Sequence, residues 1–272
     1  MKMAKSWGVA AALLVAASAA SPALAAKCGN TSAGFEAWVH EFKAEAAGKG
    51  ISPSVLDKVF STVHYNVPTI RADRGQKAFK LSLDAFMRQR GSAGIVSRGR
   101  SILKSNAAMF EGIERRFGVS PGPIIAIWGM ETGFGSYMGD QHTLSAVSTL
   151  AYDCRRTEYF TDQLYAALKL VQAGTLPVNS KGAAHGEVGQ TQFLPKNVLL
   201  YGVDGDGDGR INLAGSRADA LASTANFLKG HGWHAGAGYQ PGEPNFGAIQ
   251  GWNAARVYEE AIAIMGKQIE GK

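Results

Sequence analysis

The chain has 272 residues, of which 46% are hydrophobic and 18% are charged, enough for one large domain or two small ones. Its formal net charge of +6 suits an anionic partner such as a cell wall, a membrane or a nucleic acid, and selects none of them. No nucleic-acid-binding signature or run of basic residues accompanies the charge, so we expect no nucleic acid as partner.

The first 25 residues are typical of a secretory signal peptide. Lys2 and Lys5 precede an apolar stretch over 9–20, and small residues suit cleavage after Ala25. A retained membrane anchor is the alternative, but the apolar stretch is short for a helix that spans a bilayer. Cleavage would lower the formal net charge from +6 to +4. We therefore expect a mature, periplasmic chain of residues 26–272 without a permanent membrane anchor.

Cys28 and Cys154 are the two cysteines of the chain. In an oxidising compartment an even count favours a disulfide, which here would tie the start of the mature chain to its middle. Two buried thiols are the alternative. The pair lacks the CxxC spacing of a metal site, so we expect no metal on the cysteines alone.

Apolar residues recur at helical spacing from residue 33 to residue 116, with a loop around Pro68 and one long helix over 94–118. The stretch "PGPIIAIWGM", residues 121–130, opens with prolines and is apolar all round, which is typical of a buried helix. Sheet signals are sparse. Further helices are predicted over 143–152, 157–173, 216–230 and 248–268.

Glu131 follows this apolar run directly and precedes Gly133 and Gly135. Apolar surroundings raise the pKa of a carboxyl, so such a group keeps its proton near neutral pH and can act as a general acid. We expect Trp128 and Phe134 to wall it at the edge of a cleft. The pattern fits equally well a glutamate that caps the helix or pairs locally.

The stretch "GEVGQTQFLP", residues 186–195, combines glycines that permit close approach of the backbone with two glutamines. Gln190 and Gln192 can hydrogen-bond the amides and hydroxyls of a sugar. Taken alone, the stretch is better explained as a structural turn. His231 and His234 in "GHGWH" offer two imidazoles to a metal, but a turn that ends a helix is the simpler interpretation.

The stretch "DGDGDGRINL", residues 204–213, matches an EF-hand-like calcium loop. Its ligand and turn positions are filled by Asp204, Asp206, Asp208, Gly209 and, through its carbonyl, Arg210. Position 12 holds Gly215 in place of the bidentate glutamate, and Asp219 supplies the missing carboxylate if the loop is longer than standard. We predict a bound, structural Ca²⁺. An acidic surface turn is the alternative, although its three like charges would repel one another.

Together these stretches resemble the lytic murein transglycosylase B family of bacterial cell-wall enzymes, from about Phe35 to Ile264. The resemblance rests on "AIWGMETGFG", "TLAYDCRRTEYF", "GEVGQTQFLP", "DGDGDGRINL" followed by "ADALASTANFLKGHGW", and "WNAARVYEEAI", in the family's order. It implies a mostly α-helical fold: a lysozyme-like core from about residue 118, additional helical segments before it, and a small lobe with the calcium loop at about 177–215. These parts would form a single catalytic region over 26–272.

The resemblance also implies a reaction. The family cleaves the MurNAc–GlcNAc β-1,4 bond of peptidoglycan without water, because the C6 hydroxyl of MurNAc closes on C1 and leaves a 1,6-anhydro end. By analogy Glu131 is the sole acid and base, which protonates the leaving oxygen and then takes the proton of the C6 hydroxyl. One carboxylate is enough when the nucleophile belongs to the substrate.

Matching positions imply six residues that bind the glycan: Arg155, Arg156, Tyr159, Gln192, Asn253 and Tyr258. The implied calcium ligands are Asp204, Asp206, Asp208, Arg210 and Asp219. The chain departs from the family at Ala183, which replaces a serine, and at Phe227 and Trp252, which replace tyrosines. Each departure removes a hydroxyl and puts the preference of the sugar subsites in doubt. Glu187 is a candidate second carboxylate.

Two other functions fit parts of the pattern. An ordinary muramidase of similar architecture would hydrolyse the same bond, and a non-catalytic wall-binding or scaffold protein would only hold the glycan. The second is disfavoured because Glu131 is present with its full flanking sequence. We expect glycan strands of peptidoglycan as the partner, and a monomer.

Overall fold

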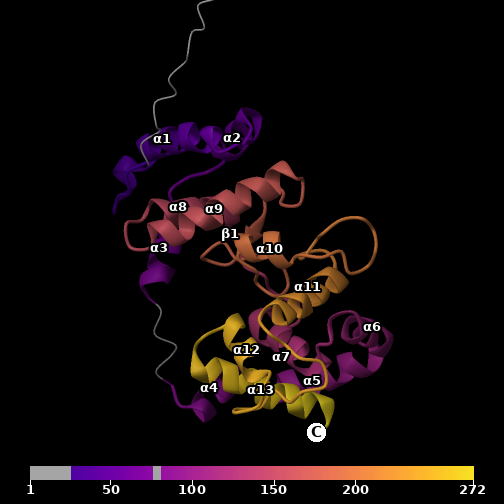
Figure 1. Cartoon of the computed structure of the whole chain (residues 1–272). Coiled ribbons are helices and arrows are strands. Elements are labelled where there is room, and N and C mark those ends of the chain that lie inside the picture. Colours follow the sequence, from indigo (N-terminus) through magenta and orange to yellow (C-terminus); the bar gives the residue numbers. More distant parts are fainter. Residues whose placement is uncertain (1–25, 76–80) are drawn as a thin grey trace, which may run out of the picture.

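The computed structural model describes residues 26–75 and 81–272, so the predicted signal peptide lies outside the described residues. Helices dominate the described part of the chain, as the sequence predicts. Its two strands, β1 (Gln141–His142) and β2 (Lys181–Gly182), form one short antiparallel pair in which Gln141 is opposite Gly182. Figure 1 shows the helices in two groups, with α10, α11 and the strands between them.

The upper group in Figure 1 is built on α8 (Thr143–Tyr152) and α9 (Thr157–Gln172), which pack against each other. Around this pair lie a 3₁₀ helix (Ser32–Gly34), α1 (Phe35–Gly48), α2 (Pro53–Phe60) and α3 (Val67–Arg74). Aromatic rings join the layers: the ring centroids of Phe35 on α1 and Tyr152 on α8 are 5.5 Å apart, edge to face. Burial of these large rings holds the N-terminal helices on α8.

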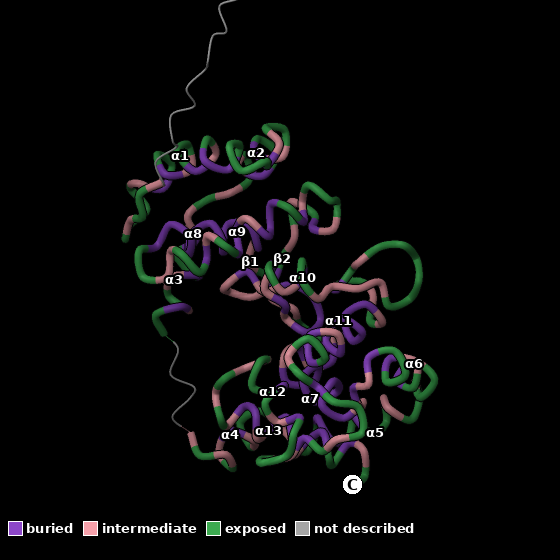
Figure 2. The backbone as a smooth tube through the Cα atoms, in the orientation of Figure 1, coloured by how far each residue is buried: buried purple, intermediate pink, exposed green. Residues whose placement is uncertain are grey.

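The lower group contains α4 (Leu83–Gln89), α5 (Ser92–Ser105), α6 (Ala107–Phe117), α7 (Pro121–Thr132), α12 (Phe246–Trp252) and α13 (Arg256–Glu270). Two helices connect the groups: α10 (Pro195–Tyr201) contacts α9 and α11, while α11 (Arg217–Gly230) contacts α6, α7 and α12. Figure 2 shows buried residues along α7, α8, α9 and α11, the interior helices. No helix in the described part of the chain is both long and apolar enough to cross a membrane.

Helices α7 and α13 cross at a pair of glycines. Gly122 on α7 lies against the backbone of Gly266 on α13, and a Cβ added to Gly266 would sit 2.9 Å from the backbone nitrogen of Pro123. The N–H of Gly122 donates to the carboxylate of Glu270 at 2.8 Å. Only glycine permits this approach, so the crossing fixes how the two helices are placed along each other.

Two helix predictions in the N-terminal half are wrong. Pro68, expected in a loop, lies in the first turn of α3, where the side chain of Asn66 caps the helix by accepting the N–H of Thr69 at 3.1 Å. The single long helix expected over 94–118 is divided into α5 and α6 at Asn106, whose side chain hydrogen-bonds the last turn of α5. Local side-chain hydrogen bonds decide both outcomes.

The helix expected over 248–268 is also wrong, because α12 and α13 are separated by residues 253–255. Asn253 has an extended backbone, and its Oδ1 accepts the N–H of Ala255 at 3.0 Å, which turns the chain. The helices expected over 143–152, 157–173 and 216–230 are confirmed as α8, α9 and α11, within one residue. The predicted boundaries of the core and of the small lobe stay predictions.

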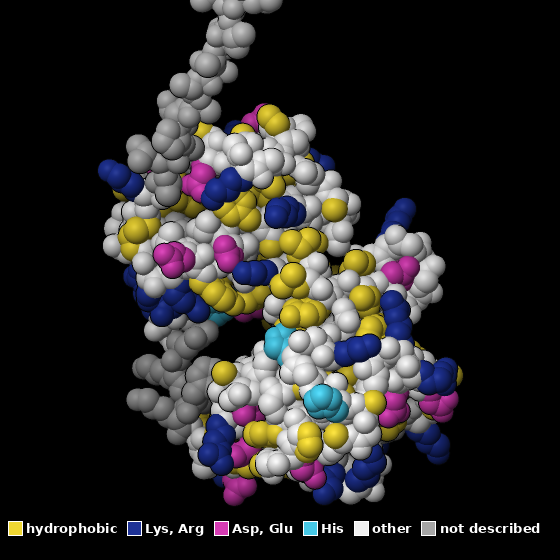
Figure 3. Space-filling model, in the orientation of Figure 1, with side chains coloured by type: hydrophobic (Ala, Val, Ile, Leu, Met, Phe, Trp, Pro, Cys, Tyr) yellow, Lys and Arg dark blue, Asp and Glu magenta, His cyan; other side chains and the backbone are white. Residues whose placement is uncertain are grey.

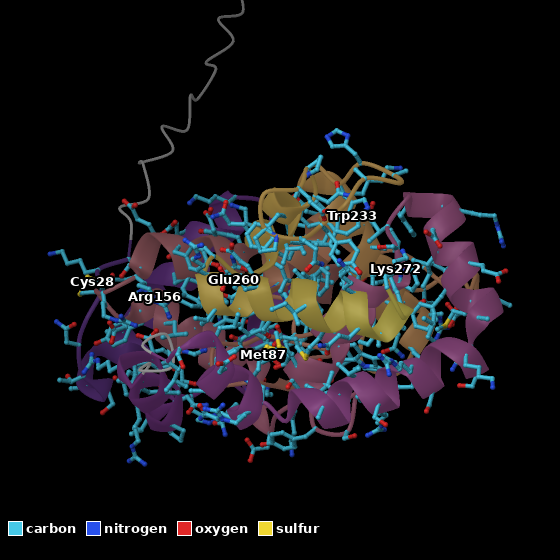
Figure 4. All side chains as sticks on the ribbon, turned by 90° about the horizontal axis from the view of Figure 1, so that it is seen from below. Cys28, Met87, Arg156, Trp233, Glu260 and Lys272 are labelled. Carbon is cyan, nitrogen blue, oxygen red and sulfur yellow. A yellow bond between two sulfur atoms is a disulfide. The ribbon has the colours of Figure 1, made fainter. Side chains whose placement is uncertain are left out.

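The predicted disulfide between Cys28 and Cys154 is present and spans a sequence separation of 126 residues. The segment beside it adds to the connection: the N–H of Gly29 donates to the carbonyl of Tyr152, and the hydroxyl of Tyr152 donates to the carbonyl of Thr31, both at 2.9 Å. In Figure 4, Cys28 and Arg156 lie on one side of the molecule and Lys272 on the other. The bridge therefore secures the N-terminal segment to the corner between α8 and α9.

Replacement of both cysteines by serine is expected to lower the free energy of unfolding by about 2–5 kcal/mol, because a cross-link over so long a loop restricts the unfolded chain strongly. Urea unfolding followed by circular dichroism measures this difference. Dithiothreitol should destabilise the wild type and leave the double variant unchanged. Equal stability of the two proteins would contradict the prediction.

Candidate active site

Glu131 lies in the last turn of α7, and two side chains from the C-terminal part of the chain hold its carboxylate. Tyr258 on α13 donates its hydroxyl to Oε1 at 2.6 Å, and Trp252 at the end of α12 donates its indole N–H to the same oxygen at 3.0 Å. The residues expected as its wall, Trp128 and Phe134, pack edge to face with centroids 5.4 Å apart. The polar partners of Glu131 thus come from α12 and α13.

Burial raises the pKa of Glu131 above the usual carboxyl value, and the charge of Glu187 adds to the effect. Hydrogen bonds from Tyr258 and Trp252 and the charge of Arg90 lower the pKa without cancelling the rise. The pKa of Tyr258 is itself raised, first by burial and then by the nearby Glu131 carboxylate, so its hydroxyl stays a donor. Glu131 therefore keeps its proton to a higher pH than an ordinary glutamate.

Two cavities meet at Glu131. The first has a volume of about 360 Å³ and also contacts Glu187, Phe227, Trp252 and Asn253, while the second, of about 390 Å³, lies toward Pro68 on α3 and Tyr137. Glu131, Ala183 and Gln192 line both cavities. Because the walls are shared, the cavities form one groove that continues on both sides of the carboxyl. Such a groove suits a chain-like ligand.

Gln192 has a backbone φ of +58°, a region that residues other than glycine seldom adopt. Its side-chain NH₂ donates to the carbonyls of Gly189 at 2.8 Å and Met138 at 3.2 Å. Since a carbonyl only accepts, these partners fix the orientation of the amide and leave Oε1 as the acceptor for a ligand. Gln190 is buried instead, and its NH₂ donates to the carbonyl of Ala214 at 3.2 Å, within the fold.

Arg155 and Arg156, expected along the glycan cleft, both form ion pairs with Asp73 of α3, which is buried. Their side chains remain 46% and 33% exposed. Tyr159, in the first turn of α9, is half exposed. Among the described residues that line the two cavities, none of these three appears. The structure thus brings Glu131, Gln192, Asn253 and Tyr258 together and puts the arginines and Tyr159 at the corner between α8 and α9.

Glu187 lines the first cavity and is anchored by His185. The backbone N–H of His185 donates to its Oε2 at 2.9 Å, and Nδ1 of the ring lies 3.2 Å from Oε1. Burial alone would raise the pKa of Glu187, but the interactions with the His185 side chain, together with backbone hydrogen bonds, outweigh burial and lower it. The groove therefore contains one carboxyl of raised pKa, Glu131, and one of lowered pKa.

The acidic loop lies between α10 and α11. Carboxylate oxygens of Asp204, Asp206 and Asp219 lie within 4.8 Å of one another. Asp219 is 1% exposed and accepts the backbone N–H groups of Gly205 at 2.8 Å and Asn212 at 2.7 Å. Asp219 therefore approaches the first two aspartates although it lies beyond the standard loop. Three carboxylates this close repel unless a cation or donors lie among them, and hard oxygen ligands suit Ca²⁺.

Asp208 does not belong to this close group. Its carboxylate accepts the N–H of Arg210 at 2.8 Å, within the loop itself. The loop is also tied to α6, because the guanidinium of Arg116 donates to the carbonyl of Asp204 at 2.9 Å. Of the predicted calcium ligands, three carboxylates therefore lie close together, those of Asp204, Asp206 and Asp219.

Sequence reasoning missed Trp252 as a partner of Glu131, and Asp73 as the partner of the two arginines. A continuous helix over 248–268 would turn Trp252 and Tyr258 toward different faces. The break after Trp252 removes this constraint. Asn253, a residue that favours turns, is the feature of the sequence that could have predicted the break. Asp73 gave no signal, because its partners are distant in sequence.

Three comparisons identify relatives of the chain. Residues 34–241 match the family model described as the transglycosylase SLT domain. A stretch of 138 residues, 47% of this chain, is 40% identical to membrane-bound lytic murein transglycosylase B of Escherichia coli (strain K12), and it spans only 38% of that protein's length.

Among solved structures, SltB3 from Pseudomonas aeruginosa in complex with NAG-anhNAM-pentapeptide is 29% identical, with a TM-score of 0.81 over 87% of this chain and 80% of that one. Escherichia coli lytic transglycosylase Slt35 in complex with calcium has a TM-score of 0.75 over 90% of this chain and 96% of that one, and its 24% identity speaks for the fold alone. The mostly helical, lysozyme-like fold expected from the sequence is confirmed, and the chain belongs to the transglycosylase SLT domain family.

Proposed function

We propose that the chain is a peptidoglycan lytic transglycosylase, which cleaves the MurNAc–GlcNAc β-1,4 bond and leaves a 1,6-anhydro-MurNAc end. One observation carries the proposal: a carboxyl of raised pKa, Glu131, held by Tyr258 and Trp252 at the meeting point of two cavities. Support comes from the relative SltB3, which was solved with an anhydro-sugar peptide in place.

In this mechanism Glu131 donates its proton to the glycosidic oxygen as the bond from that oxygen to C1 of MurNAc breaks. Positive charge develops on the sugar ring. The C6 hydroxyl oxygen of the same sugar then bonds to C1, and its proton passes to the Glu131 carboxylate, which restores the acid. The raised pKa supplies the first step, and the fixed Tyr258 and Trp252 donors steady the carboxylate for the second.

We assign the sugar contacts as follows. The Oε1 of Gln192 accepts the N–H of an N-acetyl group, and Asn253 offers its amide in the first cavity. Arg155, Arg156 and Tyr159 meet the ligand at its margin, where the exposed parts of their side chains reach solvent. Ala183 offers no hydroxyl to the ligand. At this position, where the family has a serine, the chain can contact the ligand only through the methyl group of Ala183.

We also propose a structural Ca²⁺ in the loop between α10 and α11. Asp204, Asp206 and Asp219 would be its carboxylate ligands, with Asp208 and the carbonyl of Arg210 completing the set. The ion would neutralise the loop and fasten it to α11, which carries Asp219. It takes no part in the reaction.

The remaining features of the proposal concern where and how the protein works. A single catalytic region over 26–272 would act as a monomer in the periplasm after cleavage of the signal peptide. Lys and Arg side chains are scattered over both halves of the face in Figure 3, among Asp and Glu, which fits a modest attraction to an anionic polymer rather than a dedicated basic patch.

Hydrolysis of the same bond is the second candidate, because Glu187 places a second carboxylate in the groove. A second carboxylate in the groove with Glu131 is what a hydrolase needs to activate water. Digestion of peptidoglycan in H₂¹⁸O separates the two reactions. Products of a transglycosylase are anhydro sugars without ¹⁸O, whereas a hydrolase leaves reducing ends that carry it.

The Glu131→Gln variant is expected to form anhydro products at least about 10²-fold more slowly than the wild type, because the amide cannot supply the proton. Mass spectrometry of muropeptides measures the products. A melting curve like that of the wild type would show that the fold is intact. Undiminished activity in a folded variant would rule out Glu131 as the acid.

The Tyr258→Phe variant removes a hydrogen bond that lowers the pKa of Glu131, so that pKa should rise further. Glu131 would then keep its proton to a higher pH, and the high-pH limb of the kcat/KM profile should move to higher pH. Tyr239→Phe is the matched control, since Tyr239 hydrogen-bonds Glu270 at 2.9 Å outside the groove. A limb that stays in place or moves to lower pH would contradict the prediction.

Calcium should raise the melting temperature of the EDTA-treated protein, because a ligand that binds only the folded state stabilises it by about 2.7 kcal/mol at 100 times its Kd. The Asp219→Asn variant should lose this response. Asp162→Asn is the control, since Asp162 is exposed and pairs with Lys196 away from the loop. A wild-type melting temperature that does not respond to calcium would refute the site.

A further inference from the structure

Glu187 is a charged group in the groove that the proposed acid and base steps do not use. It lines the cavity that also contains Glu131, Gln192 and Asn253, and its side chain is 22% exposed. A carboxylate beside a second, partly buried carboxyl is costly without compensation. The fold compensates through His185, which contacts both carboxylate oxygens of Glu187.

The support behind Glu187 extends through His185 to α3. The Nε2 atom of His185 lies 3.9 Å from the carboxylate of Asp73, which also pairs with Arg155 and Arg156. Asp73 is buried and contributes a fixed negative charge on the far side of the imidazole. The ring is therefore held between two carboxylates. Since an ionised carboxylate only accepts, the Nδ1 that contacts Glu187 must carry a hydrogen.

This environment makes Glu187 a poor general base. Its oxygens already accept a backbone N–H and a ring N–H, and both contacts favour the ionised form. A base that activates water needs a pKa nearer the working pH. Glu187 is instead suited to remain charged while the reaction proceeds.

We propose that Glu187, held by His185, is a second functional carboxylate of the groove: it stabilises the positive charge that develops on the sugar ring and favours the protonated form of Glu131. The inference rests on the proposed transglycosylase function. Glu187 forms and breaks no bond, and the proton still travels from Glu131 to the leaving oxygen and back from the C6 hydroxyl. An ionised group fixed beside developing charge of opposite sign acts without reorganisation.

The sign of the effect on Glu131 follows from the groups around it. Glu187 raises the pKa of Glu131, whereas Tyr258, Trp252 and Arg90 lower it, all against the larger rise from burial. Among the described residues, the charged and titratable groups that interact with Glu187 include His185, Arg156, Tyr159 and Glu131 itself. Removal of the Glu187 charge should therefore lower the pKa of Glu131, so Glu131 would lose its proton at a lower pH.

The test compares Glu187→Gln, which removes the charge at constant shape, with Glu187→Asp, which retains it. Glu111→Gln is the control for net charge, because Glu111 lies on α6 with its side chain 65% exposed. For Glu187→Gln we expect a fall in kcat of at least about tenfold with a smaller change in KM, and a high-pH limb of the kcat/KM profile moved to lower pH. Glu187→Asp should recover part of the rate, and the control should match the wild type.

A second measurement does not depend on the reaction. With ¹³C-labelled glutamate, the Glu131 carboxyl signal, assigned by its absence in Glu131→Gln, should titrate at lower pH in Glu187→Gln than in the wild type. An unmoved titration, or equal losses of activity in Glu187→Gln and Glu187→Asp, would mean that Glu187 only supports the fold and would overturn the inference. Wild-type products that carry ¹⁸O from water, lost in Glu187→Gln, would make Glu187 a base and also overturn it. A wild type that forms no anhydro product refutes the transglycosylase proposal, while the titration still reports on the coupling of the two carboxyls.

Discussion

The contact of Gly122 with Gly266 is the constraint on which the groove depends. From this crossing, Glu131 lies about 13.5 Å further along α7 and Tyr258 about 12 Å back along α13, at 1.5 Å per residue. Because the helices run in opposite directions, the two side chains meet on the same side of the crossing, at 2.6 Å. A bulkier residue at either glycine would separate the helices and, with them, the carboxyl from its donor.

The groove sets two carboxyls in opposite environments. Burial favours the protonated form of Glu131 more strongly than its hydrogen-bond donors oppose it, while Glu187 accepts hydrogen bonds from an imidazole and a backbone N–H, which favour its charge. Divergent pKa values in one site are a common way to divide acid and electrostatic roles. The division here needs both halves of the fold, because Glu131 lies on α7 and the support of Glu187 reaches to Asp73 on α3.

Local signals in the sequence predicted much of this structure. The prolines and apolar run define α7, the glycine after Thr132 ends it with φ at +57°, and the spaced aspartates mark the acidic loop. Predictions failed where a single polar side chain redirects the chain, as Asn106 and Asn253 do. Contacts between segments that are distant in sequence could not be predicted either. The residues next to Asp73 do not indicate that it pairs with two arginines, and those next to Trp252 do not indicate that it donates to Glu131. Those contacts are determined by how the helices pack in three dimensions, which the local sequence pattern does not encode.

The disulfide between Cys28 and Cys154 makes the support of the groove depend on the redox conditions around the protein. It holds the corner from which Asp153 pairs with Arg74, beside the Asp73 ion pairs that support His185 and Glu187. Disulfides do not persist where glutathione keeps thiols reduced. In a reducing compartment the chain would therefore lack this covalent link, and the corner would be held only by its ion pairs and hydrogen bonds.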